Sequence, residues 1–245
     1  MREIRAFIDQ PLSEGAEVVL DNQTSRHLAS VLRLNNGDPV TLFNGSGGEY
    51  TATLTSCSAK KVCARIDQHK NVEKESPLAI TLAIGISRGD RMDTVIQKAT
   101  EMGVISIIPL FTERTEVKLK GERLEKKLRH WQQIAISACE QCGRNLVPEI
   151  QTAQKLSDWL RSTTLENVDQ KFVLHHRSDQ DLTAVQTTPE SVILLVGPEG
   201  GLSADEISAA ADKNFNPLTL GPRVLRTETA PLAAIAILQY QWGDL

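Results

Sequence analysis

Two glycine-proline loops contain the residue types of this 245-residue chain that are best suited to hold a ligand. Residues 197–202 read Gly-Pro-Glu-Gly-Gly-Leu, and residues 221–226 read Gly-Pro-Arg-Val-Leu-Arg. Each loop follows a short apolar run and precedes a helical pattern. Glycine lets a ligand approach the backbone closely, and such loops lie at the carboxyl edge of a parallel sheet, where ligands bind. The alternative is that both loops are purely structural turns.

The residues of these loops argue against a nucleotide phosphate as the ligand. Neither loop contains the glycine pattern of dinucleotide-binding folds or the Gly-Lys-Ser/Thr of phosphate-binding loops. The carboxylate of Glu199 would repel a pyrophosphate. Backbone amides, apolar neighbours and a carboxylate suit an adenosine group that carries a positive centre. S-adenosylmethionine, with its cationic sulfur, has that character.

Cys139 and Cys142 form a Cys-x-x-Cys pair, which raises the question of metal or redox chemistry. They lie at the C-terminal end of a predicted helix, where the helix dipole disfavours a thiolate. Cys57 and Cys63 are a poor second pair for a zinc site, because five residues separate them. We therefore expect reduced cysteines and no metal site.

The first part of the chain is predicted to be a small β-rich module. Short strand-like runs at 17–20, 39–43, 49–55 and 62–66 are separated by glycine-rich turns. One helix is expected over residues 24–32, with Asn22 or Thr24 as its N-cap. The polar segment 71–77 is the expected linker, so we predict a barrel-like domain at residues 1–72 and a second domain at 73–245.

The second part alternates strands and helices, which predicts an α/β domain around a mostly parallel sheet. Ser203 and Glu206 have the spacing of a capping box at the start of a helix. Strands are expected at 78–84, 104–110, 171–175, 191–196 and 217–220. Helices are expected at 91–102, 122–142, 156–161, 203–213 and from residue 230 onward. The last helix is so apolar that it must be buried or form a dimer interface.

Charge and hydropathy limit the classes of protein to consider. The net charge of −4 argues against a uniformly basic nucleic-acid-binding surface. The acidity is concentrated in residues 148–245, which carry thirteen acidic and seven basic side chains. No apolar run approaches the ~20 residues that span a membrane. The first ten residues lack the apolar region of a secretory signal, so a cytoplasmic location is expected.

The two loops and their flanks closely resemble the RsmE family of ribosomal RNA methyltransferases. The resemblance rests on LLVGPEGGLSADE (194–206) and LTLGPRVLRTETA (218–230). It extends to the segments 27–38, 87–104, 109–118 and 131–150, and so covers nearly the whole chain. One departure is Pro231, where we expect alanine or another small residue.

This resemblance implies the fold, the cofactor and the substrate. It implies a PUA-like RNA-binding barrel followed by a SPOUT methyltransferase domain with a C-terminal trefoil knot, acting as a homodimer. The implied reaction transfers a methyl group from S-adenosylmethionine to N3 of a uridine in 16S ribosomal RNA, either free or within the assembled small subunit. The implied cofactor-binding residues are Leu195, Gly197, Pro198, Glu199, Gly200, Leu220, Gly221, Val224, Leu225 and Arg226.

The chemistry of the implied reaction selects the candidate catalytic residues. Uracil N3 carries a proton at neutral pH, and this proton must leave before or during methyl transfer. Either a carboxylate base removes it, or arginines stabilise the negative charge that grows on the ring oxygens as it leaves. Glu228 and Glu199 are the candidate bases, and Arg226 and Arg223 the candidate stabilisers. For Glu228 the alternative is a cap on the last helix, and for Arg223 a phosphate contact.

Six basic residues are candidates for RNA contacts, although each alone could be an ordinary solvated charge. They are Arg5, Arg33, Arg88, Arg91, Arg114 and Lys118.

Three other classes of protein make different demands on the sequence. An RNA-binding module without catalysis should have altered glycine loops, and a dehydrogenase should have a phosphate fingerprint. A methyltransferase acting on a ribose 2′-oxygen would share the cofactor fold and stays open.

Overall fold

A computed structural model describes residues 4–162, 165–175 and 187–245. Contacts divide the chain into two compact units, one of residues 1–75 together with 139–147, and one of residues 76–138 together with 148–245. The segment 139–147 therefore groups with the N-terminal residues, which local sequence patterns did not indicate. The division into domains at residues 72 and 73 stays a prediction.

The first unit is built on a five-stranded sheet with the order β1-β3-β4-β5-β2. Neighbouring strands are antiparallel except β1 and β3, which are parallel. Alternate residues such as Leu42, Leu54 and Ile66 point into a core that also contains Leu28. The four predicted strands are confirmed, and the three-residue β1 was missed. The strands are β1 (Arg5–Phe7), β2 (Glu17–Val19), β3 (Pro39–Phe43), β4 (Glu49–Ser58) and β5 (Lys61–Lys70).

The N-cap of the helix in this unit lies one residue before the first of the two predicted caps, Asn22. Helix α1 (Asn22–Arg26) continues directly into a π-helical turn, His27–Val31. The Asp21 carboxylate accepts hydrogen bonds from the backbone of Gln23 (2.8 Å) and Thr24 (3.0 Å). Asp21 is therefore the N-cap, and the prediction of Asn22 or Thr24 was wrong. A carboxylate at this position satisfies two backbone donors of the first turn at once.

The second unit is an α/β unit around a seven-stranded sheet in which every pair of strands is parallel. The order is β12-β10-β11-β6-β7-β8, with β9 also paired to β7. The predicted mostly parallel sheet is confirmed. The strands are β6 (Ala79–Gly85), β7 (Val104–Phe111), β8 (Glu149–Ile150), β9 (Gln154–Lys155), β10 (Gln170–Leu174), β11 (Ser191–Val196) and β12 (Asn216–Leu218).

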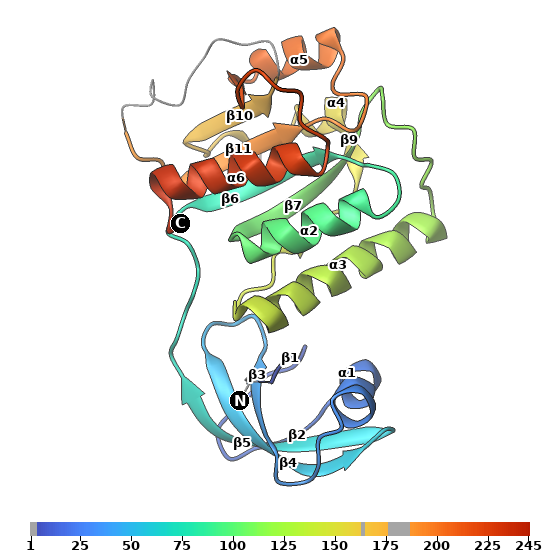
Figure 1. Cartoon of the computed structure of the whole chain (residues 1–245), viewed down its shortest axis with the longest axis vertical. Helices are drawn as coiled ribbons and strands as arrows, with labels where there is room; N and C mark the ends of the chain where they lie inside the picture. Colours follow the sequence, from blue (N-terminus) through green and yellow to red (C-terminus); the bar gives the residue numbers. More distant parts are fainter. Residues whose placement is uncertain (1–3, 163–164, 176–186) are drawn as a thin grey trace. The chain divides into compact units, whose positions relative to one another are not determined.

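Helices cover both faces of this sheet (Figure 1). Ile193 and Leu195 face a core cluster that includes Trp159 of one helix and Ala210 of another. On the opposite face Phe172 stacks on Trp242, with ring centroids 6.2 Å apart. Apolar periodicity predicted the helices at 91–102 and 122–142, the capping box predicted the one after Ser203, and a nearly continuous apolar run predicted the last one. They are α2 (Arg91–Glu101), α3 (Glu122–Cys142), α4 (Leu156–Trp159), α5 (Ala204–Ala211) and α6 (Thr229–Trp242).

A buried glutamine anchors the C-terminal end of α6. The Gln239 amide donates to the backbone oxygen of Met102 (2.9 Å) and accepts from the Ser76 hydroxyl (2.6 Å). Gly103 and Gly243 leave room for it, since a Cβ on either glycine would overlap the Gln239 side chain. Gln239 thus joins α6 to the end of α2 and to the segment before β6.

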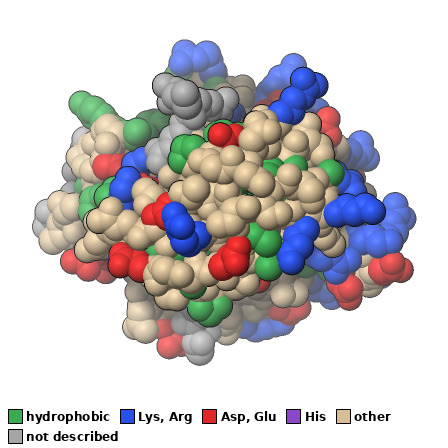
Figure 2. All heavy atoms as spheres, turned by 90° about the horizontal axis from the view of Figure 1, so that it is seen from below, with side chains coloured by type: hydrophobic (Ala, Val, Ile, Leu, Met, Phe, Trp, Pro, Cys, Tyr) green, Lys and Arg blue, Asp and Glu red, His purple; other side chains and the backbone are tan. Residues whose placement is uncertain are grey.

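The surface carries both basic and acidic side chains. On the face drawn in Figure 2, Lys and Arg side chains are interspersed with Asp and Glu. Several pairs on α3 follow helical spacing, such as Lys126 with Glu122 and Arg129 with Glu125. Within the described residues, no helix is both long and apolar enough to cross a membrane.

Replacing Gln239 tests the anchor. Gln239→Ala should lower the free energy of unfolding by about 1–3 kcal/mol, because the Met102 oxygen and the Ser76 hydroxyl lose a buried partner. Gln241→Ala, at an exposed position of the same helix, is the matched control. Urea unfolding measures both variants. Equal stability of the two would contradict the proposed role of Gln239.

Candidate functional site

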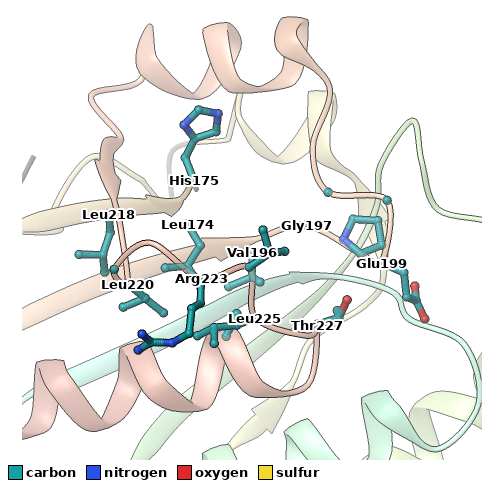
Figure 3. Close-up of a pocket in the computed structure, with 16 residues that line it drawn as sticks. Leu174, His175, Val196, Gly197, Glu199, Leu218, Leu220, Arg223, Leu225 and Thr227 are labelled. Atoms are coloured by element: carbon teal, nitrogen blue, oxygen red, sulfur yellow. The ribbon is translucent and has the colours of Figure 1, made fainter. Parts of the chain in front are cut away.

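Three adjacent parallel strands end at one pocket. β10, β11 and β12 are neighbours in the sheet, so their carboxyl ends lie at the same edge. Both glycine-proline loops follow such an end, and together they line the pocket with the end of β10 (Figure 3). The lining residues are Leu174, His175, Val196, Gly197, Pro198, Glu199, Gly200, Gly201, Leu218, Leu220, Gly221, Arg223, Val224, Leu225, Thr227 and Ala230.

The first loop folds tightly on itself at Gly197. A Cβ atom on Gly197 would lie 2.7 Å from the backbone of both Gly201 and Leu202. A Cβ on Gly85, at the end of β6, would lie 2.5 Å from the Pro198 ring. Neither position has room for a side chain, because backbone and a rigid ring cannot move aside cheaply. The glycines therefore bring the ends of β6 and β11 into direct contact.

The predicted capping box fixes the exit of this loop. The backbone of Glu206 donates to the Ser203 hydroxyl (3.2 Å), and the Glu206 carboxylate accepts from the backbone of Ser203 (2.9 Å). The other oxygen of that carboxylate accepts from the backbone of Glu113 (2.8 Å). The Arg114 guanidinium donates to the Gly200 carbonyl (2.7 Å). The segment after β7 thus holds the loop from outside the pocket.

Glu199 is engaged by the loop between β6 and α2. Its Oε1 accepts from the backbone of Arg88 and from the Arg91 guanidinium, both at 2.8 Å. Partial burial raises the pKa of the Glu199 carboxyl, but these hydrogen bonds and the charge of Arg91 outweigh burial and lower the pKa. In Figure 3 the carboxylate points away from Leu220, Leu225 and Arg223. Such a carboxylate is a poor proton acceptor.

Glu228 occupies the N-cap position of α6 but does not cap it. Within the described residues its side chain makes no capping hydrogen bond. Its Oε2 lies 3.6 Å from Nε of Arg91, and 26% of the side chain is exposed. The alternative of a helix cap is therefore not supported. Its neighbour Thr227 lines the pocket, which leaves Glu228 near the site.

Eight of the ten residues predicted to bind a cofactor line the pocket. Leu195 does not, because its side chain is fully buried in the core between the sheet and α4–α5. Arg226 is exposed and also outside the lining, whereas Arg223 lines it and points its guanidinium away from Glu199 (Figure 3). Their roles in cofactor binding and catalysis stay predictions.

The sequence reasoning missed lining residues at the strand ends and beside the second loop. Leu174 and His175 follow β10, but the order of strands in the sheet had to be known to bring them to the loops. Thr227 and Ala230 continue the second loop and could have been found from that continuity. The other missed residues are Val196, Gly201 and Leu218.

Arg5 has a structural role instead of the predicted RNA contact. Its side chain is only 5% exposed and pairs with Glu49. It also donates to the Asn145 side chain (2.7 Å) and to the Arg144 carbonyl (3.3 Å). A buried and paired guanidinium cannot reach a phosphate, so this prediction is corrected. The segment 139–147 belongs to the first unit through contacts of this kind.

The other five predicted RNA contacts divide into two groups. Arg88, Arg91 and Arg114 make contacts within the protein: Arg88 pairs with Glu116, and the other two bind the first loop. Arg33 and Lys118 are exposed. Arg33 has a positive φ of 56°, which is uncommon for a residue with a side chain. An RNA contact remains a prediction for all five.

The character of the pocket matches an adenosine group better than a polyphosphate. Leucines from three segments supply apolar surface, and the glycine loops supply backbone groups. Arg223 is the one Lys or Arg side chain in the described lining, beside His175. Among the described residues, no cluster of three or more His, Cys, Asp or Glu could hold a metal ion. None of the four cysteines forms a disulfide.

Family comparisons match both units. Residues 74–239 match the RNA methyltransferase domain, and residues 20–67 match the RNA methyltransferase PUA domain. The ribosomal RNA small subunit methyltransferase E of Buchnera aphidicola is 34% identical over 98% of this chain and 94% of its own. The protein of that name from Bacillus subtilis is 32% identical over 97% and 96%.

Solved structures agree over the full length. A methyltransferase from Legionella pneumophila, in complex with the bound cofactor SAM, has 41% identity, a TM-score of 0.95 and complete coverage of both chains. Ribosomal RNA small subunit methyltransferase E from Neisseria gonorrhoeae, bound to S-adenosyl methionine, has 41% identity and a TM-score of 0.93 over 99% of each chain. The chain therefore belongs to the ribosomal RNA small subunit methyltransferase E family.

Proposed function

We propose that the protein binds S-adenosylmethionine in the pocket of the two glycine-proline loops and methylates N3 of a uridine in 16S ribosomal RNA. The observation that carries the proposal is the convergence of both loops on one apolar pocket at the carboxyl ends of β10, β11 and β12. Family membership and the cofactor in two similar structures support the cofactor and the reaction class. The relatives' names support small-subunit ribosomal RNA as the substrate.

Apolar side chains and glycine backbone would contact different parts of the cofactor. Leu220, Val224 and Leu225 would pack on the adenosine, and the backbone at Gly197–Gly200 and Gly221 would approach it closely. S-adenosylmethionine supplies a methyl group on a cationic sulfur. Glu199 places negative charge beside the first loop, which suits a cation and disfavours a polyphosphate.

Glu228 is the proposed general base. Glu199 is bound by Arg88 and Arg91, and the pKa of its carboxyl is lowered, so it is the weaker of the two candidates. Glu228 would accept the N3 proton as the nitrogen bonds to the methyl carbon and the carbon–sulfur bond breaks. Arg223 and Arg226 would stabilise the negative charge that grows on the uracil oxygens.

The remaining parts of the proposal concern assembly. Residues 1–72 would form a PUA-like barrel that contacts RNA, and residues 73–245 a SPOUT domain with a C-terminal trefoil knot. Two chains would pair as a homodimer in the cytoplasm. Exposed apolar side chains on α6, such as Ile237 and Tyr240, support a partner surface there.

Gly197→Ala tests the pocket. The added Cβ would meet the backbone of Gly201 and Leu202, so the loop must shift and the affinity for S-adenosylmethionine should fall about tenfold or more. Gly15→Ala is the control, because Gly15 lies exposed in the first unit and a Cβ there would meet no atom within 4 Å. Calorimetric titration measures both. Wild-type affinity in Gly197→Ala would place the cofactor elsewhere.

Glu228→Gln tests the base. This variant should bind the cofactor with wild-type affinity and lose about 10²-fold or more in turnover, since the amide cannot accept the proton. Turnover is measured by transfer of a tritiated methyl group to RNA. Glu166→Gln, at an exposed position, should leave both quantities unchanged. Wild-type turnover in Glu228→Gln would remove Glu228 from the mechanism.

The product distinguishes N3 methylation from ribose methylation. An N3-methyl group blocks the Watson–Crick edge of uracil and stops reverse transcriptase, whereas a 2′-O-methyl group mostly permits passage at high nucleotide concentration. Primer extension on 16S RNA from a deletion strain and its parent should show one stop that is present only in the parent. A modification that yields a stop only at low nucleotide concentration would favour the 2′-oxygen.

A further inference from the structure

Arg91 contacts two carboxylates, one in the first ligand loop and one at the start of α6, just after the second loop. It is the first residue of α2, directly after the loop that follows β6. Its Nη1 donates to Glu199 (2.8 Å), and its Nε lies 3.6 Å from Glu228. One guanidinium therefore connects the end of β6, the loop after β11 and the start of α6.

The contact with Glu199 is reinforced on both sides. The backbone of Arg88 donates to the same carboxylate oxygen as Arg91, so Glu199 ties the first loop to the segment between β6 and α2. Gly85 and Pro198 already pack too closely for a Cβ between them. A change in the position of Glu199 would therefore move the glycine backbone that lines the pocket.

The contact with Glu228 explains the orientation of that side chain. Glu228 has helical backbone angles (φ −78°, ψ −24°), and an N-cap residue normally has extended ones. Because the side chain does not cap α6 in the described structure, its ion pair with Arg91 is the contact that orients it. A guanidinium can serve two carboxylates in one plane, which a lysine ammonium does less well.

We infer that Arg91 is a positioning residue, which acts on cofactor binding and methyl transfer through Glu199 and Glu228 and does not serve as an RNA contact. This inference rests on the proposed function of the pocket. Arg91 sets the place of the first glycine loop for the cofactor and the place of Glu228 for the proton. It also offsets part of the repulsion between the two carboxylates.

The test measures cofactor affinity without RNA, and turnover with RNA. Arg91→Gln should weaken S-adenosylmethionine binding about tenfold or more, because hydrogen bonds to a charged group are lost. Arg91→Lys should restore part of the affinity by pairing with one carboxylate. Arg129→Gln is the matched control, because the Arg129 side chain is exposed on α3 and pairs only with Glu125 among the ion pairs of the described residues. It should keep the wild-type cofactor affinity.

A double variant separates positioning from a general loss of stability. If Arg91 acts through Glu199, Arg91→Gln combined with Glu199→Gln should bind the cofactor no more weakly than the worse single variant. Additive losses would show that the two residues act independently, and would overturn the inference. Thermal unfolding without ligand identifies any variant that fails to fold, in which case Arg91→Lys and Glu199→Gln supply the comparison.

Salt dependence tests the competing role. If Arg91 contacts RNA, Arg91→Gln should keep the wild-type cofactor affinity and flatten the log–log salt slope of RNA binding by about 0.7. That pair of results would overturn the inference. If the wild-type protein itself does not bind S-adenosylmethionine, the proposed function fails. Failure of the inference about Arg91 and failure of the proposed function therefore give different results.

Discussion

The lack of space at Gly197 is the constraint on which the site depends. The chain turns so sharply at the end of β11 that a Cβ on Gly197 would lie 2.7 Å from the backbone of Gly201 and Leu202, so only glycine fits there. That turn packs Pro198 on Gly85 and directs Glu199 toward Arg91 and the backbone of Arg88. The parallel sheet places the second loop at the same edge as the first, because β11 and β12 run in the same direction and only β10 separates them. Close packing and the contacts of Glu199 thus together fix the position of the first loop at the pocket.

The charge distribution gains a specific meaning from these contacts. A net charge of −4 argues against a uniformly basic surface, and the acidity is concentrated in residues 148–245, the part of the chain that contains both ligand loops. Glu199, Glu206 and Glu228 account for part of it, and each contacts a donor from an earlier segment of the chain. Several arginines that look available for RNA are therefore engaged inside the protein.

Local signals made the elements predictable, and non-local contacts limited the prediction of the site. The apolar spacing of residues 122–142 and the run at 191–196 gave α3 and β11 with the bounds that the structure has. The three-residue β1 has no such signal, because it forms only by pairing with β3. Arg5 looked like a surface charge until its partners Glu49 and Asn145, 44 and 140 residues away, were known. Leu174 and His175 entered the pocket through the order of strands, which periodicity does not contain.

Amide hydrogen exchange with and without S-adenosylmethionine tests most directly whether the two loops form one cofactor site. The account predicts slower exchange in peptides that cover residues 197–202 and 220–227 together, at the same cofactor concentration, and no such protection by ATP. Protection confined to one loop, protection only outside both loops, or equal protection by ATP would contradict it.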